Sequence, residues 1–203
     1  MMIIMKKSHS DKISKKKLSH DRIVEVTSHA IRKSGYDGTG IADIMKQAGL
    51  THGGFYAHFD SREALLAEAA DHAGADSVAL AASIAASAPS GQALAAMLQA
   101  YLSEAHMQSI EFGCPIAALG SEMPRQADEV RHAATRHIKA MIDLVARQSP
   151  DWGQPAAHEE ALFTVAAMVG TLLLARAVDD PKLSSNLLKA SLKHLTPDSL
   201  TMP

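Results

Sequence analysis

The stretch best suited to chemistry with a partner is residues 50–59, LTHGGFYAHF. Phe55 and Phe59 are one helical turn apart and can anchor a short helix. Gly53 and Gly54 precede this pair, although each glycine costs a helix interior roughly 1 kcal/mol relative to alanine. Glycine permits close approach to the backbone, and free N–H groups at a helix start bind phosphate groups. The first turn of such a helix would therefore suit contact with a polyanion.

Three short helices are predicted to position this stretch. The first is expected to begin at a Ser19 cap and to end at Gly35. Thr39 is expected to cap the second, which Gly49 closes with the left-handed conformation of a tight turn. Thr51 is expected to cap the third. Two short helices joined at a glycine are typical of a helix-turn-helix, whose second helix enters the DNA major groove N-terminus first.

The remainder of the chain is predicted to be helical throughout. The run Asp60–Glu63, DSRE, is a capping pattern for a fourth helix, and no alternation typical of strands follows it. We therefore expect an all-α protein of about nine helices, with an N-terminal three-helix helix-turn-helix domain and a C-terminal helical domain. Glycine and proline breaks place the later helices at about 62–86, 91–109, 115–122, 125–148, 155–178 and 182–194.

The last two predicted helices are apolar on broad faces. Such faces exceed what one neighbouring helix covers, so we expect a homodimer through these helices. The apolar residues are Leu162, Val165, Ala166, Val169, Leu172 and Leu173, then Leu183, Leu187, Leu188, Leu192 and Leu195.

Composition indicates a folded cytoplasmic protein. With 47% hydrophobic and 21% charged residues, the 203-residue chain can bury a substantial core. The single cysteine, Cys114, cannot form an internal disulfide. The apolar start MMIIM is followed at once by lysines, and the run Leu162–Ala175 is too short to span a bilayer. We therefore expect neither a signal peptide nor a membrane partner.

Charge is unevenly distributed along the chain. Residues 1–62 contain 11 Lys and Arg against 6 Asp and Glu, whereas the rest contains 9 against 16. A basic end on an acidic body indicates a polyanion partner at that end. The predicted domains are a flexible, lysine-rich basic arm over 1–17, a helix-turn-helix DNA-binding domain over 18–66, and a helical effector-binding and dimerisation domain over 67–203.

The segment Thr39–Leu66 closely resembles the DNA-binding segment of TetR/AcrR-type transcriptional regulators. The resemblance is strong over about residues 20–66 and extends only as architecture over the rest. It implies a homodimer that binds double-stranded operator DNA and responds to a small-molecule effector as a repressor, although the sequence leaves activation open. Shared features are the Ala48-Gly49 turn, the Thr51 cap, Tyr56, Phe59, and a basic residue and an acid that open the next helix.

The resemblance also implies which residues bind DNA phosphates. Thr39 and Thr51 would bind phosphates through hydroxyl and backbone N–H groups. Tyr56 would donate its hydroxyl, with His58 near enough to assist, although either ring could instead simply pack at the surface. Arg62 occupies a position that a phosphate-binding lysine usually fills.

The base-facing positions implied by the resemblance are His52, Gly53 and Gly54. The family commonly has a larger polar residue at the last of these. Base reading would therefore depend on His52, assisted by Lys46, Gln47 or the lysine arm. With two glycines facing the bases, we expect part of the sequence preference to come from DNA shape.

In this family the C-terminal domain is a ligand sensor and dimer platform, which implies a pocket between its helices. Methionine adapts to varied apolar ligands, although each apolar residue at helical spacing is also a normal core residue. The candidate ligand-binding residues are Met97, Tyr101, Cys114, Met141 and Met168.

Cys114 has two interpretations. It precedes a predicted helix, whose N-terminal dipole would favour the thiolate, and some members of the family sense electrophiles or oxidants through cysteine. The favoured alternative is a small buried residue of the core. Among the 11 histidines, His132 and His137 are five residues apart and give no metal-ligand pair. No metal or other cofactor is expected.

Two other classes of function stay open. An all-helical enzyme could use His137, Asp143 or the pair Glu159-Glu160 in a cleft, but no nucleophile elbow, phosphate-binding loop or HExxH sequence supports catalysis. A dimeric helical adaptor could bind RNA or an acidic protein with its basic end. The leading hypothesis is a regulator without enzymatic activity.

Overall fold

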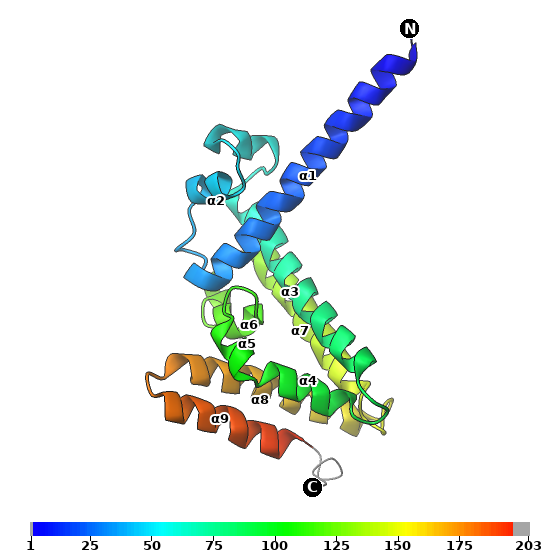
Figure 1. Ribbon diagram of the computed structural model, residues 1–203, viewed down its shortest axis with the longest axis vertical. Coiled ribbons are helices and arrows are strands. Elements are labelled where there is room, and N and C mark those ends of the chain that lie inside the picture. Colours follow the sequence, from blue (N-terminus) through cyan, green and yellow to red (C-terminus); the bar gives the residue numbers. More distant parts are fainter. Residues whose placement is uncertain (1, 197–203) are drawn as a thin grey trace.

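A computed structural model of the protein describes the backbone of residues 2–196 and the side chains of residues 15–196. Over those residues the regular structure is helical, which confirms the predicted all-α class. A small N-terminal unit lies at one end of the long helices α3 and α7, and α4, α8 and α9 lie at the other end (Figure 1). The elements are α1 (Met2–Ser34), α2 (Ile41–Gln47), η1 (His52–Ala57), α3 (Arg62–Ser87), α4 (Ala93–Tyr101), α5 (Glu104–Gln108), α6 (Pro115–Leu119), η2 (Met123–Arg125), α7 (Asp128–Ala146), α8 (Pro155–Ala177) and α9 (Pro181–Leu195).

The N-terminal unit is held together by one apolar core. Phe55 and Phe59 stack with ring centroids 5.6 Å apart and pack with Ile23 of α1 and Leu65 of α3. All four side chains are almost fully buried. Burial of each large apolar side chain contributes about 1.5–3 kcal/mol, which is enough to hold so short a helix in place. The predicted anchoring role of the two phenylalanines is confirmed.

Helix α3 connects the N-terminal unit to the helical body. It begins at Ser61, whose hydroxyl oxygen accepts a hydrogen bond from the Ala64 N–H at 3.0 Å, as the capping pattern predicts. It then packs along α7, closely enough that a Cβ atom at Gly74 would lie 2.4 Å from the His137 ring. Residue 66, the predicted end of the DNA-binding domain, lies inside this helix.

The start of the first helix differs from the prediction. α1 runs without a break from Met2 through Ser19, so the predicted cap at Ser19 is wrong. No glycine or proline interrupts residues 2–18, and Lys17 pairs with Asp21 one turn later at 2.5 Å. Such pairs stabilise a continuous helix.

One predicted helix is divided in two. The segment 91–109 forms α4 and α5, because the Ser103 hydroxyl oxygen accepts a hydrogen bond from the His106 N–H at 3.1 Å and caps a new helix. A serine inside an apolar helical pattern competes in this way with the helix backbone.

Helix α8 is both long and apolar. Its length and composition alone would allow it to cross a membrane, and 39% of its most apolar window is buried inside the protein. It packs between α7 and α9, an arrangement that core helices also adopt.

Candidate DNA-binding surface and effector cavity

A tight turn joins α2 to η1. Gly49 has a φ angle of 73°, which lies in the left-handed region that favours glycine. The Gly49 N–H bonds to the Lys46 carbonyl at 3.0 Å, and the Leu50 N–H bonds to the Met45 carbonyl at 2.8 Å. The side chains of Met45 and Ala48 are buried beneath the turn. The structure therefore contains the predicted helix-turn-helix.

The second helix of this motif is a 3₁₀ helix without a side-chain cap. Thr51 occupies the N-cap position, but its hydroxyl accepts no capping hydrogen bond. The Gly54 N–H bonds instead to the Thr51 carbonyl at 3.0 Å, because 3₁₀ geometry satisfies the donor that a side-chain cap would take. The predicted capping bond is wrong, and the side chain of Thr51 is exposed.

Neither glycine of η1 is required by the fold itself. A Cβ atom at Gly53 would meet no other atom within 4 Å. At Gly54 it would make only ordinary contacts, 3.6 Å to the Thr51 hydroxyl oxygen and 3.7 Å to Met45 Cε. Neither residue has a positive φ angle. The two glycines therefore leave the outer surface of η1 bare, that is, without side chains, although the packing of the protein does not require this.

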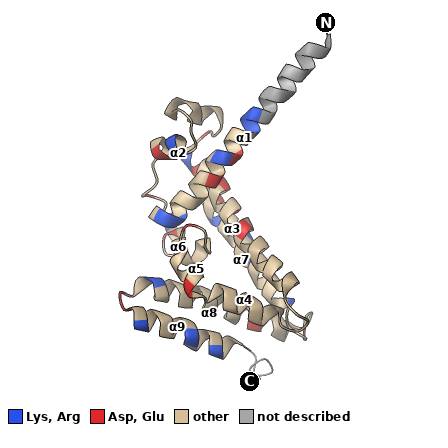
Figure 2. Cartoon of the chain, viewed as in Figure 1, with Lys and Arg blue, Asp and Glu red and all other residues tan. Residues whose placement is uncertain are grey.

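Polar side chains surround this bare surface. Tyr56 is 71% exposed, with its ring edge against Phe55 at a centroid distance of 5.2 Å. His52 is exposed on η1, and Lys46 and Gln47 are exposed at the end of α2. Lysine and arginine also occur along the described part of α1 (Figure 2). These groups can donate to anionic oxygens from two sides of the glycines.

Two predicted DNA-binding residues brace the turn before α2. The Thr39 side chain is buried and donates to the Gly35 carbonyl at 2.9 Å. Gly40, not Thr39, is the N-cap residue of α2, so the predicted cap is wrong by one residue. The Arg62 guanidinium donates to the Tyr36 carbonyl and, at 3.5 Å, to the Thr39 carbonyl. Both side chains therefore shape the turn.

The same turn is tied to the helical body. The Glu122 carboxylate, which lies just after α6, accepts a hydrogen bond from the Tyr36 N–H at 2.9 Å. The Tyr36 ring is fully buried between the two parts. The orientation of the helix-turn-helix is thus linked to the body through this contact.

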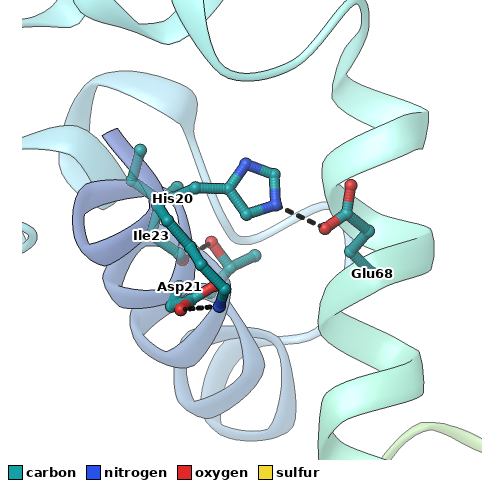
Figure 3. A network of polar contacts seen from close by, with 6 residues as sticks. His20, Asp21, Ile23 and Glu68 are labelled. Atoms are coloured by element: carbon teal, nitrogen blue, oxygen red, sulfur yellow. Dashed lines mark hydrogen bonds and ion pairs between the residues drawn. The ribbon is translucent and has the colours of Figure 1, made fainter. Parts of the chain in front are cut away.

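His20 and Glu68 form a contact that no feature of the sequence predicted. The His20 Nε2 atom lies 2.6 Å from the Glu68 carboxylate, bridging α1 and α3 (Figure 3). The His20 ring also stacks on Phe59 at 4.5 Å. Beside it, burial lowers the pKa of His58, and the neighbouring His20 and Lys16 lower it further. A neutral His58 makes a weak phosphate ligand, and this favours a packing role.

Two adjacent cavities occur in the helical body, with volumes of about 300 and 560 Å³. Both have sizes typical of small-molecule sites. The smaller lies between α3, α7 and α8 and is almost wholly apolar. The larger extends from α4 and α7 to the end of α1. All five predicted ligand-binding residues line one or both: Met97, Tyr101, Cys114, Met141 and Met168.

A polar cluster that the sequence did not reveal joins α4, α5 and the start of α6 in the cavity wall. His106 Nδ1 lies 2.7 Å from the Tyr101 carbonyl, and its Nε2 accepts the Cys114 N–H at 3.0 Å. These partners assign the neutral tautomer, and burial lowers the pKa of His106. The Tyr101 hydroxyl and Arg176 Nη1 are buried without hydrogen-bond partners among the described residues.

Cys114 is buried and occupies the N-cap position of α6. Its side chain lines both cavities, so a reagent must enter them to reach the sulfur atom. This placement is compatible with the core interpretation and with an effector that reacts inside the cavity. It does not support a thiol that is open to solvent.

The residues of the enzyme hypothesis form no evident active site. His137 lies 2.8 Å from Asp71, while Asp143, Glu159 and Glu160 are exposed. Within the described residues, no three His, Cys, Asp or Glu side chains come together as metal ligands would.

The outer face of α8 and α9 carries exposed apolar side chains. On α8, Phe163 is 67% exposed and Leu174 is 52% exposed. Leu162, Leu173 and Leu183 extend this surface, and Gly170 lies among them with open space at its Cβ position. We call these six residues the α8–α9 apolar face.

Comparisons with known families match both parts of the chain. Residues 23–69 match the family described as "Bacterial regulatory proteins, tetR family". Residues 90–183 match the family described as "Transcriptional regulator LmrA/YxaF-like, C-terminal domain".

Similar proteins and structures agree with these matches. An uncharacterized HTH-type transcriptional regulator of Mycobacterium tuberculosis is 31% identical over 168 residues, covering 79% of this chain and 85% of its own. One encoded in the lacX 3' region of Lactococcus lactis subsp. lactis is 30% identical over 191 residues, covering 86% and 93%. The crystal structure of reduced Escherichia coli NemR superposes with a TM-score of 0.74 at 18% identity, covering 88% and 95%. A TetR regulator from Chloroflexus aurantiacus gives a TM-score of 0.73 at 24% identity, covering 90% and 94%.

Proposed function

The chain belongs to the TetR family of bacterial transcriptional regulators, and from this premise we propose that it represses transcription by binding operator DNA as a homodimer. A small molecule in the cavities of the helical body would release it. The observation that supports the proposal is the bare surface at the start of η1, where the fold does not require glycine at positions 53 and 54. Close approach of a DNA phosphate to the backbone gives these glycines a reason.

The exposed residues around the glycines would have different roles in DNA binding. Thr51 and Tyr56 would donate to phosphates and fix the register, whereas His52 would contact base edges. Lys46 and Gln47, at the end of α2, are placed to assist from the side.

Three further predicted residues would act less directly. Thr39 and Arg62 hold the turn before α2 through hydrogen bonds to backbone carbonyls, and would position the motif more than grip DNA. His58 is half-buried and would support η1 through packing against His20.

The homodimer would form through the α8–α9 apolar face. Exposed aromatic and leucine side chains on one face of a helix are typical of an interface between copies. Two DNA-binding units so joined would meet half-sites about 34–36 Å apart. An effector that favours a different separation of the units would weaken DNA binding, typically by 1–3 kcal/mol of coupling. Such a regulator would act in the cytoplasm, where the DNA is.

The effector could bind reversibly or react with Cys114. Hydrogen peroxide added to the protein–DNA complex distinguishes the two, because Cys114→Ser removes the only thiol. Release from the native protein but not from the variant would support a reactive effector. Equal behaviour of both proteins would assign Cys114 to the core.

A mobility-shift titration on the DNA upstream of the protein's own gene tests the proposed function. A scrambled duplex of the same length and composition serves as the control. A dimer making 6–10 phosphate contacts should lose roughly 10³–10⁵ in affinity between 50 and 200 mM salt, while still preferring the upstream sequence. Equal binding to both duplexes, or a preference for RNA, would instead support a helical adaptor.

A further inference from the structure

The larger cavity is lined by two chemically different sets of side chains. The apolar set includes Leu80, Ile84, Met97, Met141 and Met168. The polar set comes from three parts of the chain: His29 and Arg32 of α1, Tyr101 of α4 and His106 of α5. A molecule that fills the whole cavity must therefore combine an apolar part with a polar group.

Arg32 is the unusual residue of the polar set. Its side chain is only 4% exposed, yet it lines the cavity. Its guanidinium donates to the Ser28 carbonyl at 3.0 Å, to the Gly113 carbonyl at 3.1 Å and to the Ser28 hydroxyl oxygen at 3.4 Å. These partners are all neutral, and the guanidinium makes no ion pair with a described carboxylate. A buried charge without a counter-ion is costly, so such groups are usually paired.

The two acidic residues that contribute to the charge environment of Arg32 each contact another side chain. Asp76 contributes to the charge environment of Arg32, but its carboxylate lies 3.4 Å from His72 and its side chain is half-exposed at the cavity wall. Glu111 pairs with Lys33 at 3.4 Å. Neither supplies the counter-ion that the buried guanidinium lacks.

A second buried donor lies in the same cavity. The Tyr101 hydroxyl has no hydrogen-bond partner among the described residues, although its ring lines the cavity. A buried, unpaired hydroxyl costs about as much as a lost hydrogen bond unless a ligand or water satisfies it. Arg176, near Tyr101, is half-buried, and its Nη1 atom has no hydrogen-bond partner among the described residues.

From these observations we infer that the cavity binds an amphipathic carboxylate, with its anionic head at Arg32 and the Tyr101 hydroxyl. Its apolar chain lies among Met97, Met141 and Met168. The inference rests on the proposed effector role of the cavity and names the class of ligand. A carboxylate accepts two parallel hydrogen bonds from a guanidinium, and methionines pack against flexible chains.

The position of Arg32 gives such a ligand a direct path to the DNA-binding unit. Arg32 lies in the last turns of α1, which also packs against η1 and α2. Its bond to the Gly113 carbonyl joins α1 to the segment before α6. A carboxylate that draws the guanidinium toward itself competes with this bond and so acts on α1 itself.

Calorimetric titration of the full-length protein with three probes of equal chain length tests the inference. Decanoate has the anionic head, decanol lacks the charge, and decyltrimethylammonium carries the opposite charge. Decanoate should bind at least tenfold more tightly than decanol, and the cation should bind least. Equal affinities for decanoate and decanol would overturn the inference.

Three variants locate the head group. Arg32→Gln should weaken decanoate binding about tenfold or more while leaving decanol binding unchanged. Tyr101→Phe should weaken decanoate binding severalfold, and Asp76→Asn should strengthen it. The control Arg131→Gln removes an exposed arginine on α7 and should change nothing. If Arg32→Gln does not fold, Tyr101→Phe and Asp76→Asn still decide, and wild-type affinity in both would contradict the assignment.

Failure of the inference differs from failure of the proposed function. Suppose that decanoate binds with the predicted pattern among the variants but does not release the protein from operator DNA. The anion site is then supported, and effector-controlled repression is contradicted. If decanol releases DNA as well as decanoate does, repression stands and the anion site fails.

Discussion

At the residue scale, neither the backbone conformation nor the packing of η1 requires its two glycines. Gly49 has a backbone conformation that favours glycine, whereas Gly53 and Gly54 have ordinary φ angles and room for a side chain. Alanine at either position would be more favourable in a helix by up to about 1 kcal/mol. Since the fold does not require these two glycines, we attribute them to the proposed contact with DNA, in which a phosphate approaches the backbone.

Adding a side chain at Gly54 should therefore separate folding from DNA binding. We expect Gly54→Leu to fold normally, because the space beside it admits a Cβ atom at ordinary contact distance. Operator affinity should fall at least about tenfold, since the new side chain holds phosphates away from the N–H groups. Thermal unfolding and mobility shifts measure the two effects. Ala86→Leu adds similar bulk at the far end of α3 and should leave both unchanged, whereas wild-type operator affinity in Gly54→Leu would refute the close-approach argument.

Two tyrosines provide a second test at this scale. Tyr56→Phe should lower operator affinity roughly tenfold and leave the free energy of unfolding unchanged, because the ring is 71% exposed and only a charge-assisted hydrogen bond is lost. Tyr36→Phe is the counterpart, because that hydroxyl is buried and has no hydrogen-bond partner in the described part of the chain. Its removal should leave stability equal or higher and DNA affinity unchanged. Competition mobility shifts and urea unfolding report on both variants, and a Tyr56→Phe protein with native affinity would leave Tyr56 as a surface aromatic.

At the element scale, the helices that the sequence predicted well are those with local start and stop signals. Ser61 begins α3, Pro155 begins α8 and Pro181 begins α9, each within about a residue of the prediction. The errors occur where a potential capping side chain competes with other hydrogen-bond partners. Ser19 and Thr39 are good capping residues, but the chain around them satisfies its hydrogen bonds in other ways. Ser103 interrupts a pattern that periodicity alone reads as one helix.

The turn between α2 and η1 gives a prediction that contrasts two glycines of one motif. Gly49→Ala should lower the free energy of unfolding by about 1–2 kcal/mol, because the left-handed conformation strains any residue with a Cβ atom. Space is not the reason, since the nearest atom to that Cβ would be Arg22 Nη1 at 3.7 Å. Gly53→Ala should instead raise stability by up to about 1 kcal/mol. Thermal unfolding of the two variants side by side checks this, and a shift in the same direction for both would contradict the backbone assignment.

At the scale of the whole molecule, part of the site could be predicted from the sequence and part could not. Met97, Tyr101, Cys114, Met141 and Met168 line the cavities because apolar residues on helices that pack together converge on one core. Arg32 did not stand out, because nothing near it in the sequence indicates that an arginine is buried. Its partner is the Gly113 carbonyl, 81 residues away, and only the folded chain brings the two together.

The assembly of two copies gives the last prediction. Phe163 projects from α8 with 67% of its surface exposed, near Gly170, where open space lets another helix approach closely. Phe163→Glu should dissociate the homodimer, because burying a carboxylate in an apolar interface is prohibitive unless it is paired. The monomer should remain folded, since the exposed ring contributes little to its core, and operator affinity should collapse because one DNA-binding unit spans only one half-site. Sedimentation velocity measures the dissociation, circular dichroism measures the folding of the monomer, and mobility shifts measure the operator affinity. Trp152→Glu places the same charge on an exposed aromatic outside this face and should remain a dimer. A dimeric Phe163→Glu protein would show that the two copies meet elsewhere, and the separation of their DNA-binding units would then be set by different helices.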